Sequence, residues 1–242
     1  MTGNFDQQAI EYHERATIQR DLASWTAEWL EPNGSDLEAV EFGAGTGHFT
    51  KLAVRTGMRL RAVDLSPRMV EVGSAKEPKA HWEEGNAWMP ADNLRTDRIL
   101  SSALLQWCPD PAATFSRWFT CLRDDGRILS GLFVRETLPE LTQVLPGAEP
   151  FTWRSVAEWK DLFQKAGFAV ARADISERIY RFSDARALFR YLHRIGSVCV
   201  GRFSAGNLRS ALRSYDQQFA QGKTVRSTWT FLRIECFCSE GN

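Results

Sequence analysis

The chain has 242 residues, of which 43% are hydrophobic and 25% charged, with equal numbers of basic and acidic side chains. This composition is typical of a globular protein with one α/β domain, and it argues against a nucleic-acid-binding protein. No apolar run approaches the roughly 20 residues that cross a bilayer. The first residues do not resemble a signal peptide, and five scattered cysteines favour a reducing compartment over a disulfide framework or a zinc site. We therefore expect a cytoplasmic protein without a membrane, nucleic-acid or metal partner.

The first half of the chain alternates strand and helix patterns. Residues 8–30 place apolar side chains at helical spacing and predict an N-terminal helical cover over residues 1–30. Short apolar segments then predict strands at residues 39–42, 60–64, 81–83, 99–105 and 127–134, with helices at 49–55 and from Pro67. Strands that alternate with helices indicate a mostly parallel sheet with helices on both faces.

The second half follows a different pattern. Residues 137–150 read as a loop, and Ser155 with Glu158 forms a capping-box pattern at the start of a helix over 155–168. Alternating segments at 169–182 and 226–237 predict two late strands, with helices at 184–195 and 205–219 between them. We expect a single domain over residues 1–242, with a seven-stranded sheet and a helical lid insertion at 183–222 above the carboxyl edge of the sheet.

A glycine-rich loop connects the first strand to its helix. Its sequence is Glu41-Phe42-Gly43-Ala44-Gly45-Thr46-Gly47. Glycines allow a sharp turn and close approach of a ligand, and the following helix N-terminus suits a carboxylate. Glu41 offers an acid to a cationic group, and Asp64, at the end of the next strand, offers acceptors to two ribose hydroxyls. These features predict a site for S-adenosylmethionine (SAM).

A nicotinamide or flavin dehydrogenase is the main rival for this loop. Its fingerprint is G-x-G-x-x-G, whereas the spacing here is G-x-G-x-G and His48 occupies the third glycine's place. Further along, the turn Gly85–Pro90 follows the third strand. Asn86 there is a candidate to bind an adenine ring and Trp88 to cover it, while Met69 is a candidate to pack on the adenosine.

These motifs resemble the class I SAM-dependent methyltransferases. Four segments also resemble the malonyl-acyl-carrier-protein O-methyltransferases of biotin synthesis: residues 5–20, Ser101–Cys108, Thr137–Leu141 and Leu192–Gly196. The chain departs from that narrower family at Asn86, where the family usually has an acid, and at residues 197–200, where it often has two asparagines.

The resemblance implies methyl transfer from SAM to the free carboxylate of malonyl on an acyl-carrier protein. The cofactor-binding residues expected from the motifs and the resemblance are Gln19, Glu41, Gly43, Ala44, Gly45, Gly47, Asp64, Leu65, Met69, Asn86, Ala87 and Ser102. The residues expected on the substrate side are Tyr12, Gln106, Trp107, His193 and Arg194. Tyr12 and Gln19 are alternatively expected to close over SAM.

The neutral total charge hides a basic C-terminal third. Residues 172–235 carry twelve basic and five acidic side chains, which leaves an excess of seven acids in the remainder. Arg186, Arg190 and Arg194 recur at four-residue spacing and predict a cationic stripe on one helix face, which Arg202, Arg209 and Arg213 extend. We expect this stripe to attract an acidic acyl-carrier protein.

Two other functions are compatible with the sequence. The first is a methyltransferase for a small free carboxylic acid or a quinone, and the second is a non-catalytic accessory protein that binds SAM or the carrier. A DNA or RNA methyltransferase is disfavoured because Ser102-Ala103-Leu104-Leu105 stands where an N/D-P-P-Y/F element would hold an amine.

Overall fold

The computed structural model describes residues 16–32, 36–148, 152–195 and 203–239. Within these residues the main sheet has the strand order β3-β2-β1-β4-β5-β8-β6, and the two-residue strand β7 pairs with β8. The strands are β1 Glu38–Phe42, β2 Arg59–Asp64, β3 His81–Glu84, β4 Thr96–Ser102, β5 Leu122–Phe133, β6 Phe168–Phe182, β7 Ala220–Gln221 and β8 Thr224–Cys238. Neighbouring strands from β3 to β5 are parallel, and β8 is antiparallel to both β5 and β6. The predicted seven-stranded, mostly parallel α/β fold is confirmed.

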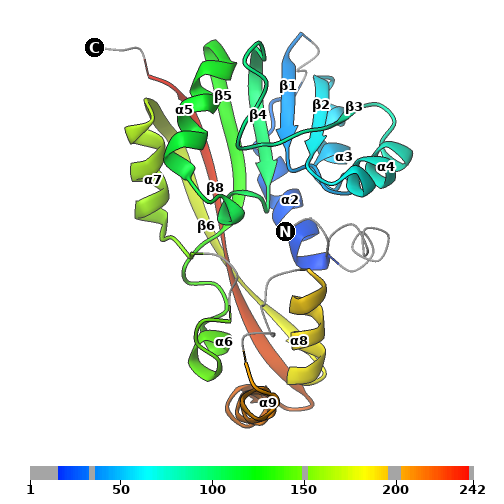
Figure 1. Ribbon diagram of the computed structural model, residues 1–242, viewed down its shortest axis with the longest axis vertical. Coiled ribbons are helices and arrows are strands. Elements are labelled where there is room, and N and C mark those ends of the chain that lie inside the picture. The colour runs from blue at the N-terminus through cyan, green and yellow to red at the C-terminus, as the bar shows by residue number, and fades with distance from the viewer. Residues whose placement is uncertain (1–15, 33–35, 149–151, 196–202, 240–242) are drawn as a thin grey trace.

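Helices cover both faces of the sheet (Figure 1). They are α2 Thr17–Ala27, α3 Thr50–Ala53, α4 Pro67–Lys76, α5 Pro111–Cys121, α6 Pro139–Val144, α7 Val156–Lys165, α8 Ala185–Arg194 and α9 Ala205–Phe219, with 3-10 helices η1 Val54–Thr56 and η2 Leu105–Trp107. The capping box at Ser155 and Glu158 is present at the start of α7. None of the helices in the described parts of the chain has the length and apolar character that a membrane span requires.

Several elements differ from the sequence predictions. Residues 137–150 do not form a loop throughout, because α6 lies within them. The fourth predicted strand ends at Ser102 instead of Leu105, because Ala103 takes a positive φ of 55° and η2 follows. The predicted elements also lacked α5, although Asp110 and Pro111 form a helix-start pattern there, with Asp110 as the cap and Pro111 as the first helical residue.

α2 packs directly against the middle of the sheet. A Cβ added at Gly131 of β5 would lie 2.1 Å from the Thr26 hydroxyl, so only glycine permits this approach. The buried face of α2 includes Gln19 and Leu22. This packing brings the amino-terminal helix to the carboxyl ends of β4 and β5, where Gln19 can reach a ligand.

β6 and β8 extend beyond the other strands and carry a second cluster of helices, α6, α8 and α9 (Figure 1). Buried apolar residues of these three helices, of α2 and of the carboxyl end of β5 form one hydrophobic cluster with the amino-terminal half of β8. Tyr191 of α8 donates a hydrogen bond to Gln19 of α2 over 3.0 Å. The helices between β6 and β8 are therefore attached to the main domain close to the strand ends.

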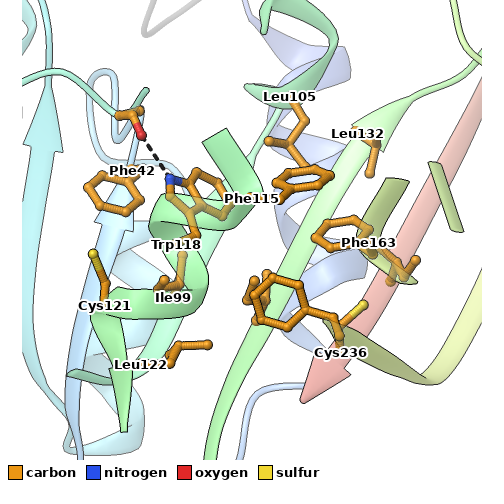
Figure 2. Packing of buried hydrophobic residues seen from close by; sticks show 14 of the residues in the cluster. Phe42, Ile99, Leu105, Phe115, Trp118, Cys121, Leu122, Leu132, Phe163 and Cys236 are labelled. Carbon is orange, nitrogen blue, oxygen red and sulfur yellow. Dashed lines mark hydrogen bonds between the residues drawn. The ribbon is translucent and has the colours of Figure 1, made fainter. Parts of the chain in front are cut away.

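A buried aromatic cluster lies between the sheet and helices α5 and α7. Figure 2 shows Trp118 of α5 beside Phe42, the last residue of β1, and the two rings stack with centroids 5.2 Å apart. The Trp118 indole N–H donates to the Ala87 carbonyl over 2.8 Å. This bond fixes the turn after β3 against the core, so the core itself positions the residues that face the strand ends.

Candidate active site

A cavity of about 270 Å³ opens at the carboxyl ends of β1, β2 and β4. Loops at this edge of a parallel sheet are the usual ligand-binding elements of open α/β folds. The residues that line this cavity are Gln19, Ala23, Glu41, Gly43, Ala44, Gly45, Thr46, His48, Phe49, Asp64, Leu65, Ser66, Met69, Gly85, Asn86, Ala87, Trp88, Ser102, Ala103, Leu104, Gln106, Trp107, Phe133 and Ile195. Segments from α2 to the end of α8 thus converge on one cavity.

The glycine loop forms one wall of this cavity and depends on left-handed backbone conformations. Gly43, Gly45 and Gly47 have φ values of 67°, 55° and 91°, which residues with a Cβ adopt at a cost. A Cβ at Gly45 would meet no atom within 4 Å, because this residue faces open space, whereas one at Gly43 would lie 2.6 Å from Leu104. The loop therefore presents bare backbone to the cavity.

Asp64 is held by two backbone amides. Its Oδ2 accepts from Gly45 N over 2.8 Å, and its Oδ1 accepts from Ser66 N over 2.9 Å. These bonds tie the end of β2 to the glycine loop and orient the carboxylate at the cavity wall. Each carboxylate oxygen has a further lone-pair direction, so the group can also accept from two ligand hydroxyls.

Glu41 is a buried acid, only 1% exposed, in the lining of the cavity. Burial raises its pKa to about 8, and the charge of Asp64 adds to this effect, while a hydrogen bond from Thr50 Oγ1 opposes it. That bond spans 2.7 Å to Oε2. Near neutral pH this environment favours the protonated form of Glu41, and a cation in the cavity would favour the carboxylate instead.

The turn after β3 contributes Asn86 and Trp88. Asn86 Oδ1 already accepts from Trp88 N over 2.9 Å, so its amide N–H groups are the part left to face a ligand. Met69 is buried at the start of α4, where the Ser66 side chain caps the helix. Together Met69, Ala87 and Trp88 give this end of the cavity an apolar lining.

Another part of the cavity wall is formed by the end of β4 and by η2. Gln106 is 4% exposed, and its Nε2 donates to the Ala103 carbonyl over 2.7 Å. The buried Ser102 Oγ and Gln106 Oε1 have no hydrogen-bond partner among the described residues. Unsatisfied buried oxygens are uncommon in folded proteins, and both of these belong to residues of the cavity wall.

Comparisons with known proteins agree with this geometry. A family model described as a methyltransferase domain matches residues 12–173. The chain belongs to the class I SAM-dependent methyltransferases. A malonyl-acyl-carrier-protein O-methyltransferase from Serratia marcescens is 27% identical over 213 residues, which cover 85% of this chain and 81% of that protein.

Solved methyltransferase structures share the fold at low identity. One from Bacillus halodurans has a TM-score of 0.68 and 13% identity over 90% of this chain and 99% of that chain. A geranyl diphosphate C-methyltransferase from Streptomyces coelicolor, which holds S-adenosyl-L-homocysteine (SAH), has a TM-score of 0.57 and 14% identity over 90% and 75% of the two chains. The cofactor of the protein described in this structure, as a member of the same family, is SAM.

Eleven of the twelve predicted cofactor residues line the cavity of this methyltransferase, and Gly47 does not. A Cβ at Gly47 would instead face the side chains of Glu77 and Trp82, each 3.4 Å away. The residues present fit SAM: bare glycine backbone, an oriented carboxylate at Asp64, and a buried acid at Glu41. Their individual roles in holding SAM remain predictions.

The predicted substrate residues divide into three groups. Gln106 and Trp107 line the cavity, whereas His193 and Arg194 lie on the exposed side of α8 outside its lining. Tyr12 lies outside the described residues. Three further lining residues were not predicted for the cavity. Ile195 and Phe133 are apolar residues of an ordinary kind, which carry no signal for a ligand. His48 was considered only as a bulky residue in the place of a glycine.

Proposed function

We propose that this methyltransferase transfers the SAM methyl group to the free carboxylate of malonyl on an acyl-carrier protein. The observation that carries the proposal is the position of α8. Its carboxyl end is followed by Ile195, which lines the cofactor cavity, and its amino end presents Arg186 beside Arg209 and Arg213 of α9. The name of the Serratia relative supports the same acceptor.

The arginines of α8 and α9 differ from those of the sheet region. Near the sheet, Arg98 approaches Glu31 and Arg123 approaches Glu38, each at 2.6 Å. By contrast, five exposed arginines of α8 and α9 have no hydrogen bond or ion pair within the described part of the chain: Arg186, Arg190, Arg194, Arg209 and Arg213. Arg202, which was also predicted for this stripe, lies outside the described residues. Unpaired positive charges gathered on α8 and α9 favour encounter with an acidic partner.

The same surface also has two acids, Asp184 and Asp216, which are fewer than its five arginines and leave it with a net positive charge. Asp184 accepts from Ala187 N over 2.6 Å and Asp216 accepts from Ala185 N over 2.7 Å, so both carboxylates cap the start of α8. An α8 of ten residues is about 15 Å long. A carrier bound at the arginines would therefore need a flexible arm to deliver its acyl group to the cavity, as acyl carriers do.

The chemistry asks little of the protein beyond positioning. When bound, SAM supplies an electrophilic methyl group on a positively charged sulfur. The malonyl carboxylate is ionised at neutral pH, because its ordinary pKa is near 4, so no general base is needed. The chain has to align the carboxylate and exclude water, and Trp107, Phe133 and Ile195 give the cavity an apolar side for that purpose. His193 and Arg194, on the outer side of α8, suit the carrier's arm better than the carboxylate.

The test is incubation of the purified protein with methyl-labelled SAM and malonyl-acyl-carrier protein. We expect a base-labile methyl ester on the carrier, and much slower labelling of succinyl-carrier protein, malonyl-CoA and free malonate. Equal labelling of free malonate would favour a small-acid methyltransferase. SAM binding without transfer to any acyl carrier would favour an accessory protein.

A further inference from the structure

A second pocket, of about 350 Å³, lies between α8 and α9 and shares no residue with the cofactor cavity. The residues that line this pocket are Asp184, Arg186, Arg209, Leu212, Arg213 and Asp216. Arg186 comes from the first turn of α8, while Arg209 and Arg213 lie one turn apart on the same side of α9. The pocket therefore gathers three guanidinium groups from two helices.

Positive charge prevails in this pocket. None of its three arginines has a hydrogen bond or ion pair with another residue in the part of the chain that the structure describes. Its two carboxylates are used at the start of α8, where Asp184 accepts from Ala187 N and Asp216 accepts from Ala185 N. Three arginines and two aspartates leave one excess positive charge. An anion that enters the pocket would stabilise these neighbouring like charges.

The chemistry of the lining favours a phosphate ester as this anion. Guanidinium groups are planar and form paired hydrogen bonds with phosphate oxygens. One excess positive charge matches a phosphodiester, which carries one negative charge. The half-buried Leu212 adds an apolar contact, which suits an organic arm attached to the phosphate better than a free inorganic ion.

The position of the pocket fits the arm of an acyl-carrier protein, in which a phosphodiester joins the protein to pantetheine. Arg186 lies at the amino end of α8, whereas Ile195, directly after its carboxyl end, lines the cofactor cavity (Figure 1). The ten residues of α8 span about 15 Å. A pantetheine chain is comparable in length to about five extended residues, which reach about 17 Å. A phosphate held in the pocket thus leaves the acyl end long enough to reach the cavity.

We propose that the pocket between α8 and α9 binds the phosphodiester of the carrier's pantetheine arm. This inference rests on the proposed function and deepens it, because it assigns a defined subsite to the arm in addition to the general attraction of an acidic carrier. Arg186, Arg209 and Arg213 then contact the phosphate. Arg190, on α8 but outside the pocket, contributes long-range attraction alone.

The first test titrates isotope-labelled protein with phosphopantetheine and, separately, with pantetheine, and follows the arginine side-chain N–H resonances by NMR. The resonances that disappear in Arg209→Gln and in Arg213→Gln identify the pocket, and the one that disappears in Arg190→Gln is the control. We expect phosphopantetheine to shift the two pocket resonances and pantetheine to leave them in place. Shifts with both compounds, shifts with neither, or an equal shift of the Arg190 resonance would overturn the assignment.

The second test measures methyl transfer to malonyl-phosphopantetheine and to malonyl-pantetheine. In the wild type we expect the KM of the phosphorylated substrate to be about fivefold lower, because exposed charges contribute modestly. This advantage should fall below twofold in Arg213→Gln. Arg190→Gln, which removes the same charge outside the pocket, should keep the advantage. An equal advantage in all three proteins would contradict binding of the phosphate in the pocket.

CoA carries the same arm, so separate titrations with holo-carrier protein and with CoA identify the source of the phosphate. The pocket resonances should respond at a lower concentration of carrier than of CoA, and the reverse order would overturn the proposal. Methylation of malonyl-carrier protein without any response of these resonances overturns this inference alone. Phosphopantetheine binding without a methyl ester on malonyl-carrier protein overturns the proposed function and leaves the pocket's phosphate site in place.

Discussion

At the scale of single residues, Glu41 is an acid whose buried position in the cavity wall favours its neutral form. A carboxyl group that is 1% exposed and close to Asp64 keeps its proton at neutral pH, since burial raises its pKa to about 8. In the unfolded chain the same group ionises near its ordinary value. Binding of the cationic SAM amino group should therefore release a proton, and the site is suited to a positive ligand.

Replacement of this acid gives a test of its protonation. A raised pKa in the folded state stabilises the protein fully below the unfolded pKa, and this stabilisation is lost as the pH rises through 8. Glu41→Gln mimics the neutral acid at every pH. Between pH 5.5 and 8.5 we expect the unfolding free energy of the wild type, measured with urea in the absence of SAM, to fall by on the order of 3 kcal/mol relative to the variant. Parallel pH profiles for the two proteins would show that Glu41 is ionised in the folded state.

At the scale of elements, α5 links the core to the cofactor cavity. Trp118 stacks on Phe42 at the end of β1 and donates to the Ala87 carbonyl in the turn after β3 (Figure 2). One side chain thereby contacts both the strand that leads into the glycine loop and the turn that contributes Ala87 to the cavity. Its replacement should affect both stability and cofactor binding.

Trp118→Phe keeps an aromatic ring and removes the donor, which leaves a buried carbonyl unsatisfied. We expect a loss of about 2 kcal/mol in unfolding free energy and weaker SAM binding. Trp82→Phe is the matched control, because Trp82 donates to the Glu77 carbonyl over 3.0 Å in a half-buried position. Its effect on stability should be smaller; an equal or larger loss in the control would count against the linking role of Trp118.

Local signals predicted the elements that carry the cofactor loop. The apolar strand before Gly43, the acid at the end of the next strand and the Ser155 capping box each depend on neighbouring residues, and the structure has all three elements. Most of the cavity lining could be predicted for the same reason, since parallel strands bring their carboxyl ends to one edge.

Other features depend on long-range contacts that spacing does not report. α6 starts where Leu138, with a φ of 57°, donates to the Thr228 carbonyl on β8, so a tertiary contact sets this helix. Helical periodicity placed His193 and Arg194 on a helix, but the burial of Leu188 and Leu192 directs them to the outer side. Gly47 has the expected left-handed backbone and yet faces Trp82.

At the scale of the whole molecule, charge and topology divide the protein into two regions. The parallel strands build the cofactor cavity, whereas the extended β6 and β8 carry α8 and α9 with their unpaired arginines (Figure 1). If the carrier docks on α8 and α9, reversing the charge of their arginines should weaken carrier binding and leave the cofactor site unaffected.

We expect Arg186→Glu combined with Arg209→Glu to weaken binding of malonyl-acyl-carrier protein by at least about tenfold at low salt, with unchanged SAM affinity. The difference from wild type should shrink as salt screens the charges. Arg55→Glu, an exposed arginine on η1, is the matched control and should bind the carrier normally. Carrier affinity that is the same in all three proteins would argue against docking on α8 and α9.

Calorimetric titration of SAH into the wild-type protein and into Asp64→Ala tests the central claim most directly, namely that the strand ends and the glycine loop form the cofactor site. Asp64 receives backbone amides from Gly45 and Ser66, whereas the exposed Asp92 serves as the matched control in Asp92→Ala. We predict binding at one site per chain, an affinity about 100-fold lower in Asp64→Ala, and no change in Asp92→Ala. No uptake of SAH by the wild type, or equal affinity in Asp64→Ala, would contradict the account.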